Sequence, residues 1–185
     1  FIKAFSTEYP QVTYKLYSAD ADDIKDRVNK GLLDICLLTE PVDVDKYDFI
    51  RIPQKERWGV IMRKDSPLAQ KRSVEPEDLL AYPILIPGRA LVQNELDNWF
   101  GDAYGAVHII GRYNLIYNAA ILVEAGVGVA LCLEKLVPVS EETELCFRTL
   151  APAFETGVVI AWKKNQIFPP AVAKFIELLK NAFRA

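Results

Sequence analysis

Residues 31–41 read GLLDICLLTEP, an apolar run that holds one carboxylate, Asp34, and stops at a polar residue, Thr39. Residues 33–38 are too few for a typical helix. Apart from Asp34 they are apolar on both alternating faces, which is typical of a strand in a sheet covered by helices. Gly31 suits the left-handed position that ends a helix. This stretch predicts an α/β fold with a parallel sheet, and it raises the question of what the carboxylate and the threonine do.

The residues before this stretch complete a strand–helix–strand unit. Residues 11–17 (QVTYKLY) alternate in character, as a strand does. Residues 19–30 form a predicted helix with Asp20 as its N-cap and two more aspartates in its first turn, where carboxylates suit the helix dipole. The strand at 33–38 is expected to pair in parallel with 11–17. Asp34, buried near its start, is expected to accept backbone N–H bonds from a neighbouring helix or turn.

The rest of the chain continues the alternation of strands and helices. Further strands are predicted at 49–53, 57–63, 83–86, 106–111, 127–133, 143–150 and 157–163. Further helices are predicted at 75–80, 89–100 and 114–125, with a last one that begins at 169–170. The second half therefore repeats the pieces of the first.

The composition argues against nucleic-acid binding by this domain and against a membrane span. The chain is 51% hydrophobic with a net charge of −3, and it has no basic stripe, so this domain is not expected to hold nucleic acid itself. Its apolar runs are too short for a membrane span. The three cysteines, Cys36, Cys132 and Cys146, include no CxxC pair and are expected to be buried free thiols in a reducing compartment.

Motifs for catalysis or cofactors are missing from the sequence. His108 is the single histidine, in an alternating strand pattern, so neither a zinc site nor another metal site is expected. Residues 126–128 (GVG) lie between a helix and a following strand, the reverse of the order that a dinucleotide fingerprint needs. We therefore expect no catalytic residues and no cofactor.

Five segments resemble, in order, motifs of the effector-binding (regulatory) domain of the LysR-type transcriptional regulators. They are Tyr9-Pro10-Gln11-Val12, Gly31-Leu32-Leu33-Asp34-Ile35, Asp65-Ser66-Pro67-Leu68-Ala69, Glu77-Asp78-Leu79-Leu80-Ala81-Tyr82-Pro83-Ile84 and Val123-Glu124-Ala125-Gly126-Val127-Gly128-Val129-Ala130-Leu131. The chain departs from the family pattern at residues 132–134 (CLE), where a proline usually stands.

The resemblance implies a type-2 periplasmic-binding-protein-like fold. In such a fold two α/β subdomains are joined by two crossover strands, here expected at 57–62 and 157–162, with a ligand cleft between the subdomains. Subdomain I is expected to comprise 1–82 and 158–185, and subdomain II 83–157. The N-terminal winged helix-turn-helix and the family's first strand are expected to precede residue 1.

Ligand-binding candidates lie where strands end and helices begin, since free N–H groups meet polar ligands there. They are Ser18, Ala19, Thr39, Glu40, Pro87, Gly88, Arg89, Asn114, Leu115 and Asn118. Thr39 matches a pocket position of the family, and Arg89 suits a carboxylate. Ser18 as a mere turn residue, Asn114 as a mere N-cap and Arg89 as a solvated side chain remain alternatives, and Glu40 at the rim disfavours an anion.

The predicted function is that of a small-molecule sensor in a bacterial transcription regulator. The effector is expected to be a small carboxylate or other anion, and the protein a cytoplasmic homodimer or homotetramer that meets DNA only through its N-terminal domain and has no membrane partner. The first alternative is a periplasmic-type solute-binding protein of a transporter, which shares the fold. The second is an enzyme on the same fold, although the sequence shows no convincing acid–base pair.

Overall fold

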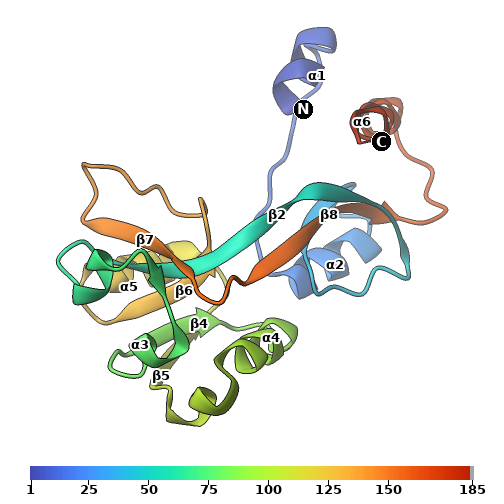
Figure 1. Cartoon of the computed structure of the whole chain (residues 1–185). Helices are drawn as coiled ribbons and strands as arrows, with labels where there is room; N and C mark the ends of the chain where they lie inside the picture. The colour runs from blue at the N-terminus through green and yellow to red at the C-terminus, as the bar shows by residue number, and fades with distance from the viewer. Residues whose placement is uncertain (184–185) are drawn as a thin grey trace. The chain divides into compact units, whose positions relative to one another are not determined.

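The computed structural model describes residues 1–183, which form two compact units (Figure 1). The first unit comprises Phe1–Gln54 and Gly157–Ala185, and the second comprises Lys55–Thr156. The chain passes between them within β2 (Tyr47–Arg63) and again within β8 (Glu155–Lys163). These strands contain the two predicted crossover segments, so the double passage of a periplasmic-binding-protein-like α/β fold is present.

Along the chain, one boundary between the two units falls close to a predicted subdomain boundary, and the other falls far from it. The second change falls between residues 156 and 157, one residue from the prediction, whereas the first falls after Gln54 rather than after residue 82. The reason is that β2 continues into the second unit, where residues 58–63 pair with two of its strands. The short segments that follow β2 then belong to the same unit.

The sheet of the first unit lies between helices. Strand β1 (Cys36–Thr39) pairs antiparallel with β8, from Cys36 opposite Ala161 to Thr39 opposite Val158. Helix α2 (Ala21–Asn29) packs on the face that presents Val159 and Ala161. Helix α6 (Pro170–Ala182) packs on the opposite face, against Ile160 and Trp162. Helix α1 (Ile2–Glu8) contacts α6 through the rings of Phe5 and Phe175, 5.1 Å apart.

The predicted ends of α2 are confirmed. The Asp20 side chain accepts hydrogen bonds from the backbone N–H groups of Asp22 and Asp23, at 3.1 and 3.0 Å. Gly31 has φ +71°, the left-handed conformation that lets the chain turn out of the helix. The start and stop signals around 19–31 therefore work as the sequence indicated.

The predicted strand at 11–17 is wrong, and so is its parallel pairing. Residues 12–17 have no regular secondary structure and form no ladder among the described residues, and β1 has β8 as its one described partner. Strand β1 is also shorter than predicted and is open on one side, with Leu37 64% exposed. Alternation predicts an extended conformation, but a strand needs a neighbour as well. Asp34 is exposed and makes no hydrogen bond or ion pair with a described residue, so its expected backbone partners are not found.

The second unit holds a larger mixed sheet. Its elements are the 3₁₀ turn η1 (Pro67–Gln70), β3 (Ser73–Val74), α3 (Pro76–Leu79), β4 (Ile84–Pro87), α4 (Ala90–Phe100), η2 (Gly101–Ala106), β5 (Ile109–Tyr113), α5 (Ile116–Glu124), β6 (Val129–Leu133) and β7 (Leu145–Leu150). The strand order is β2-β6-β4-β5, with β7 on the other edge of β2 and β3 beside β7. Strand β4 runs parallel to both β5 and β6.

Helices α4 and α5 cover opposite faces of this sheet. Leu96 and Phe100 of α4 join one core with Leu131, whereas Val123 of α5 joins another with Ala130. Neighbouring β6 residues thus point to different helices, as alternation in a doubly covered sheet requires. No helix among residues 1–183 has the length and apolar character needed to cross a membrane.

Candidate functional site

The carboxyl ends of β4 and β5 meet at one edge of the second sheet. The two strands are parallel, with Pro87 opposite Tyr113, so the loops that follow them are neighbours. One loop leads through Gly88 into α4, and the other leads through Asn114 into α5. The N-termini of two helices therefore open at the same edge, where their first N–H groups have no partner within the helix. This edge brings together the candidates predicted in the second unit.

Gly88 allows the two loops to approach each other. Its N–H donates to the Tyr113 carbonyl at 2.8 Å, and a Cβ at position 88 would lie 3.3 Å from the same oxygen. The sequence suggested that this glycine allows close approach of a ligand. The contact in the structure is between two stretches of backbone.

Gln93, which was not among the predicted ligand residues, links the two loops. Its side-chain amide donates to the carbonyls of Gly88, at 2.8 Å, and Pro87, at 3.3 Å, and its Oε1 accepts from Nε of Arg112, at 3.3 Å. The available signal was an amide side chain in the first turn of the predicted helix 89–100. Through Gln93, the guanidinium of Arg112 on β5 is tied to the loop before α4.

The remaining candidates in this unit sit at helix starts. Arg89 is half-buried and is the N-cap residue of α4, and its carbonyl accepts from Gln93 N at 2.9 Å. The alternative that Asn114 is only the N-cap of α5 is wrong, because Leu115 holds that position and the Asn114 side chain accepts from Leu115 N at 2.9 Å. Asn118, in the first turn of α5, is exposed. Donors and acceptors thus surround the two helix starts.

Tyr113 anchors the end of β5 rather than offering acid–base chemistry. Its hydroxyl donates to the Leu131 carbonyl at 2.5 Å, and burial raises the pKa of the phenol well above its ordinary value. The phenol stays protonated, and its hydrogen bond ties the end of β5 to β6, the strand on the other side of β4.

Thr39 and Glu40 end β1 in the first unit. Thr39 is half-buried and lies opposite Val158 of β8. The N–H of Glu40 donates to the Gly157 carbonyl at 2.9 Å, and its carboxylate accepts from Arg51 Nε at 3.0 Å. The negative charge that disfavoured an anionic ligand is therefore paired with a cation.

Ser18 and Ala19 lie before α2 and differ in exposure. Ser18 is exposed and makes no hydrogen bond with a residue among 1–183, whereas Ala19 packs against the core that α2 shares with β1. Ser18 can still meet a ligand, but Ala19 contributes packing at the start of the helix.

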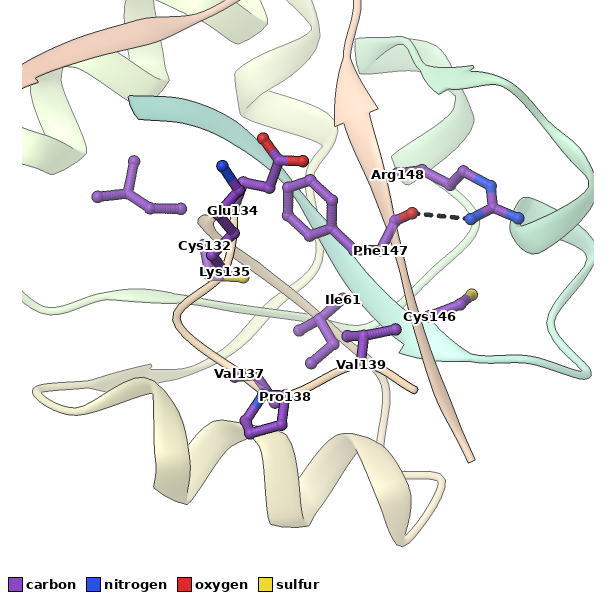
Figure 2. A pocket seen from close by; sticks show the side chains of 11 residues that line it. Ile61, Cys132, Glu134, Lys135, Val137, Pro138, Val139, Cys146, Phe147 and Arg148 are labelled. Carbon is purple, nitrogen blue, oxygen red and sulfur yellow. Dashed lines mark hydrogen bonds between the residues drawn. The ribbon is translucent and has the colours of Figure 1, made fainter. Parts of the chain in front are cut away.

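A separate hollow of about 480 Å³ opens in the second unit (Figure 2). It is lined by residues of β6 and β7, by the chain between them and by Ile61 of β2, and by none of the predicted ligand residues. The Arg148 guanidinium on its wall donates to the carbonyls of Ala69, Lys71 and Phe147 at 2.6–2.8 Å, as the dashed line to Phe147 in Figure 2 illustrates. The Arg148 guanidinium is thus already engaged by backbone carbonyl groups.

The cysteines offer neither a metal site nor a reactive thiol. All three are free and buried, as predicted. Burial raises the pKa of Cys36 to about 11 and that of Cys132 to about 12, so both remain thiols at neutral pH. Among residues 1–183, no three His, Cys, Asp or Glu side chains gather in a way that would hold a metal ion.

Comparison with known proteins identifies similar chains. The family model of the "LysR substrate binding domain" matches residues 1–184. A curated relative, the "Uncharacterized HTH-type transcriptional regulator YybE" of Bacillus subtilis (strain 168), is 25% identical over 184 residues, which are 98% of this chain and 62% of the relative. The chain thus spans less than two thirds of that relative's length.

Two solved structures share the fold. The effector binding domain of QuiR in complex with shikimate has a TM-score of 0.81 and 14% identity, over 98% of this chain and 88% of that one. The Synechocystis CcmR regulatory domain in complex with 2-PG has a TM-score of 0.77 and 18% identity, over 99% of this chain and 89% of that one. At these identities the likeness shows the fold.

Proposed function

Since this chain belongs to the LysR substrate-binding domain family, we propose that it is the small-molecule-sensing, effector-binding domain of a bacterial LysR-type transcriptional regulator. The family match over residues 1–184 is the observation that carries the proposal. That family is a class of regulatory domain rather than a class of enzyme. In this proposal the bound effector alters DNA binding or transcription activation by the full-length protein, which meets DNA through a winged helix-turn-helix outside this chain.

The ligand would be held by the strand ends and helix starts described above. In the second unit these are Gly88, Arg89 and Asn114, at the edge where α4 and α5 begin. In the first unit they are Ser18 and Thr39. We propose that both sets contribute to ligand binding.

A small carboxylate or another small anion is the proposed ligand class. Two helix starts and the cationic side chains of Arg89 and Arg112 favour negative charge at one edge of the second sheet. The negative charge of Glu40, which disfavoured an anionic ligand, is paired with Arg51. Shikimate in QuiR and 2-PG in CcmR are in keeping with a small polar ligand for this fold.

A thermal-shift screen of small metabolites, rich in carboxylates and phosphates, tests the proposal. A ligand at one hundred times its Kd should add about 2.7 kcal/mol of stability. The response should fall in Thr39→Ala and persist in Thr7→Ala, whose exposed threonine lies on α1. A full response in Thr39→Ala would remove Thr39 from the site.

The ligand's charge is tested with a second pair of variants. Arg89→Gln should weaken the binding of any carboxylate hit at least tenfold by isothermal titration. Arg72→Gln, at an exposed position outside the predicted site, should leave binding unchanged. Equal affinities in the two variants would show that Arg89 does not meet the anion.

We further propose that the full-length protein is a cytoplasmic homodimer or homotetramer. Helix α5 supports this, because Tyr117, Ile121 and Leu122 leave an exposed apolar face, with Tyr117 72% exposed. Light scattering on the full-length protein should give a multiple of the subunit mass, and Ile121→Lys should reduce it. The transporter alternative predicts instead a monomer that binds ligand and has no effect on DNA binding.

A further inference from the structure

The hollow between β6, β7 and the chain that joins them is lined by none of the residues proposed to bind the effector. Its volume of about 480 Å³ falls within the range of pockets that hold small molecules, roughly 300–1,000 Å³. Every residue that lines it belongs to the second unit. The hollow is therefore a separate candidate site within one compact body, and its lining indicates which kind of molecule fits.

The middle of the hollow is apolar. Ile61 of β2 is buried and lines it, and so does the ring of Phe147. This ring lies over Gly59, where a Cβ would collide with it, so the ring rests directly on the sheet. Figure 2 shows both side chains between Glu134 at one end of the hollow and Val137 at the other. A molecule in the hollow therefore meets apolar surface that includes one aromatic ring.

Three charged residues line the hollow, and two of them already have partners. The Glu134 carboxylate accepts from Nε and Nη2 of Arg57 at 2.8–3.0 Å, so its negative charge is paired. The Arg148 guanidinium is held by three backbone carbonyl groups, which leave its positive charge in place. Lys135 is exposed and makes no ion pair or hydrogen bond with a residue among 1–183. The charged group available to a ligand is thus a cation.

The backbone at Lys135 adopts a conformation that lysine rarely takes. Its φ is +65°, in the left-handed region that glycine enters freely, and a residue with a Cβ pays about 1–2 kcal/mol there. This turn ends β6 and leads into residues 136–139, three of which also line the hollow. A glycine would make the same turn without strain. Strain kept at a position that borders a cavity points to a role for the side chain.

We propose that the hollow is a second small-molecule site, separate from the effector site, and that it takes a small amphipathic carboxylate. The apolar body of the ligand lies against Ile61 and Phe147, and its carboxylate accepts a charge-assisted hydrogen bond from the Lys135 ammonium. The charge of Arg148 on the wall adds to the positive potential. The site uses none of the residues assigned to the effector, so it does not depend on the proposed function.

Heteronuclear NMR with cinnamate as the probe locates the site. Cinnamate carries an apolar body and one carboxylate, and it should shift the amide signals of residues 134–139 and 146–148, which surround the hollow. Cinnamyl alcohol, with a similar body and no charge, and acetate, with the charge and almost no body, should both bind more weakly. If millimolar cinnamate shifts no amide, or only those of residues 87–93 and 112–118, the proposal is overturned.

Substitutions at Lys135 test the charge, with affinities fitted from the shifts at 134–139. Lys135→Asn removes the cation, and asparagine tolerates the left-handed turn, so the fold is kept. This variant should bind cinnamate about fivefold or more weakly and cinnamyl alcohol as before. Lys135→Arg should stay within about twofold of the unchanged protein. Arg72→Gln, exposed and outside the hollow, is the matched control, and equal cinnamate affinities in Lys135→Asn and Arg72→Gln would contradict the proposal.

A filled hollow gives a readout that does not involve charge. Val139 is 43% exposed and lines the hollow, so Val139→Trp should occupy it and abolish binding of both molecules without lowering Tm. Full-strength binding by this variant would show that the probe lies elsewhere. Thr39→Ala and Arg89→Gln, which test the effector site, should leave the shifts at 134–139 unchanged. The second site can therefore fail while the proposed function stands, and the reverse.

Discussion

Replacing Gly128 by alanine should destabilise the second unit by about 2–4 kcal/mol. Gly128 precedes β6, and a Cβ there would collide with the Pro83 carbonyl oxygen and lie 3.0 Å from its carbonyl carbon. These obstacles are backbone atoms that cannot rotate away, so β6 must shift from β4. Overpacking of this kind costs about 1–3 kcal/mol. Loss of the 2.9 Å bond from Val129 N to Pro83 O adds about 1 kcal/mol.

Two other glycines serve as controls in urea unfolding followed by circular dichroism. At Gly105 a Cβ meets nothing within 4 Å, so Gly105→Ala should change the free energy of unfolding by less than about 0.5 kcal/mol. Gly126 also has open space but a φ of +79°, so Gly126→Ala should cost about 1–2 kcal/mol through backbone strain. If Gly128→Ala unfolds at the same urea concentration as Gly105→Ala, the close approach to Pro83 does not constrain the sheet and the reasoning fails.

Three more predictions concern the caps and the thiols. Asp20→Ala should cost about 1 kcal/mol in urea unfolding, since two amide donors, on Asp22 and Asp23, lose their acceptor, whereas Asp20→Asn should be nearly neutral. Cys36 and Cys132 should react with a thiol reagent at pH 8 much more slowly in the folded protein than in urea, and rapid labelling would contradict their burial. Because burial raises both pKa values, the folded state keeps these protons. Stability should therefore be full below about pH 9 and fall above it, by about 1.4 kcal/mol per pH unit for each thiol, in urea titrations between pH 9 and 11.

Local signals in the sequence predicted the fold well. They could not show which extended segments pair with strands far away in the chain. Asp20 and Gly31 mark the ends of α2, because capping depends on residues within one turn. The alternation in 11–17 predicted a strand, but whether an extended segment joins a sheet depends on a neighbour far away in the chain. The predicted strands 49–53 and 57–63 proved to be parts of one long strand, β2, because the residues between them stay extended.

The candidate site was predictable only in outline. Two parallel strands that end side by side bring the loops after Pro87 and Tyr113 together, and the order of strands and helices indicated this. The close contact at Gly88 and the bridge through Gln93 depend on the distance between two loops, which no spacing along the chain encodes. Asp34 shows the same limit, because an apolar run predicted burial for a side chain that faces an open groove.

The stretch 31–41 thus serves two parts of the first unit. Its beginning, with Asp34, borders the groove, and its end holds the point where the chain returns from the second unit. Glu40 N–H donates to the carbonyl of Gly157, the residue at which the first unit resumes, and the Glu40 carboxylate lies so close over Gly157 that a Cβ would collide with it. An effector shifts a protein between two states only if it binds them with different affinities. If the ligand meets Thr39, as we propose, the pairing of Thr39 with Val158 and the hydrogen bond from Glu40 to Gly157 connect that contact directly to the start of β8, and a difference in affinity between two states can arise there.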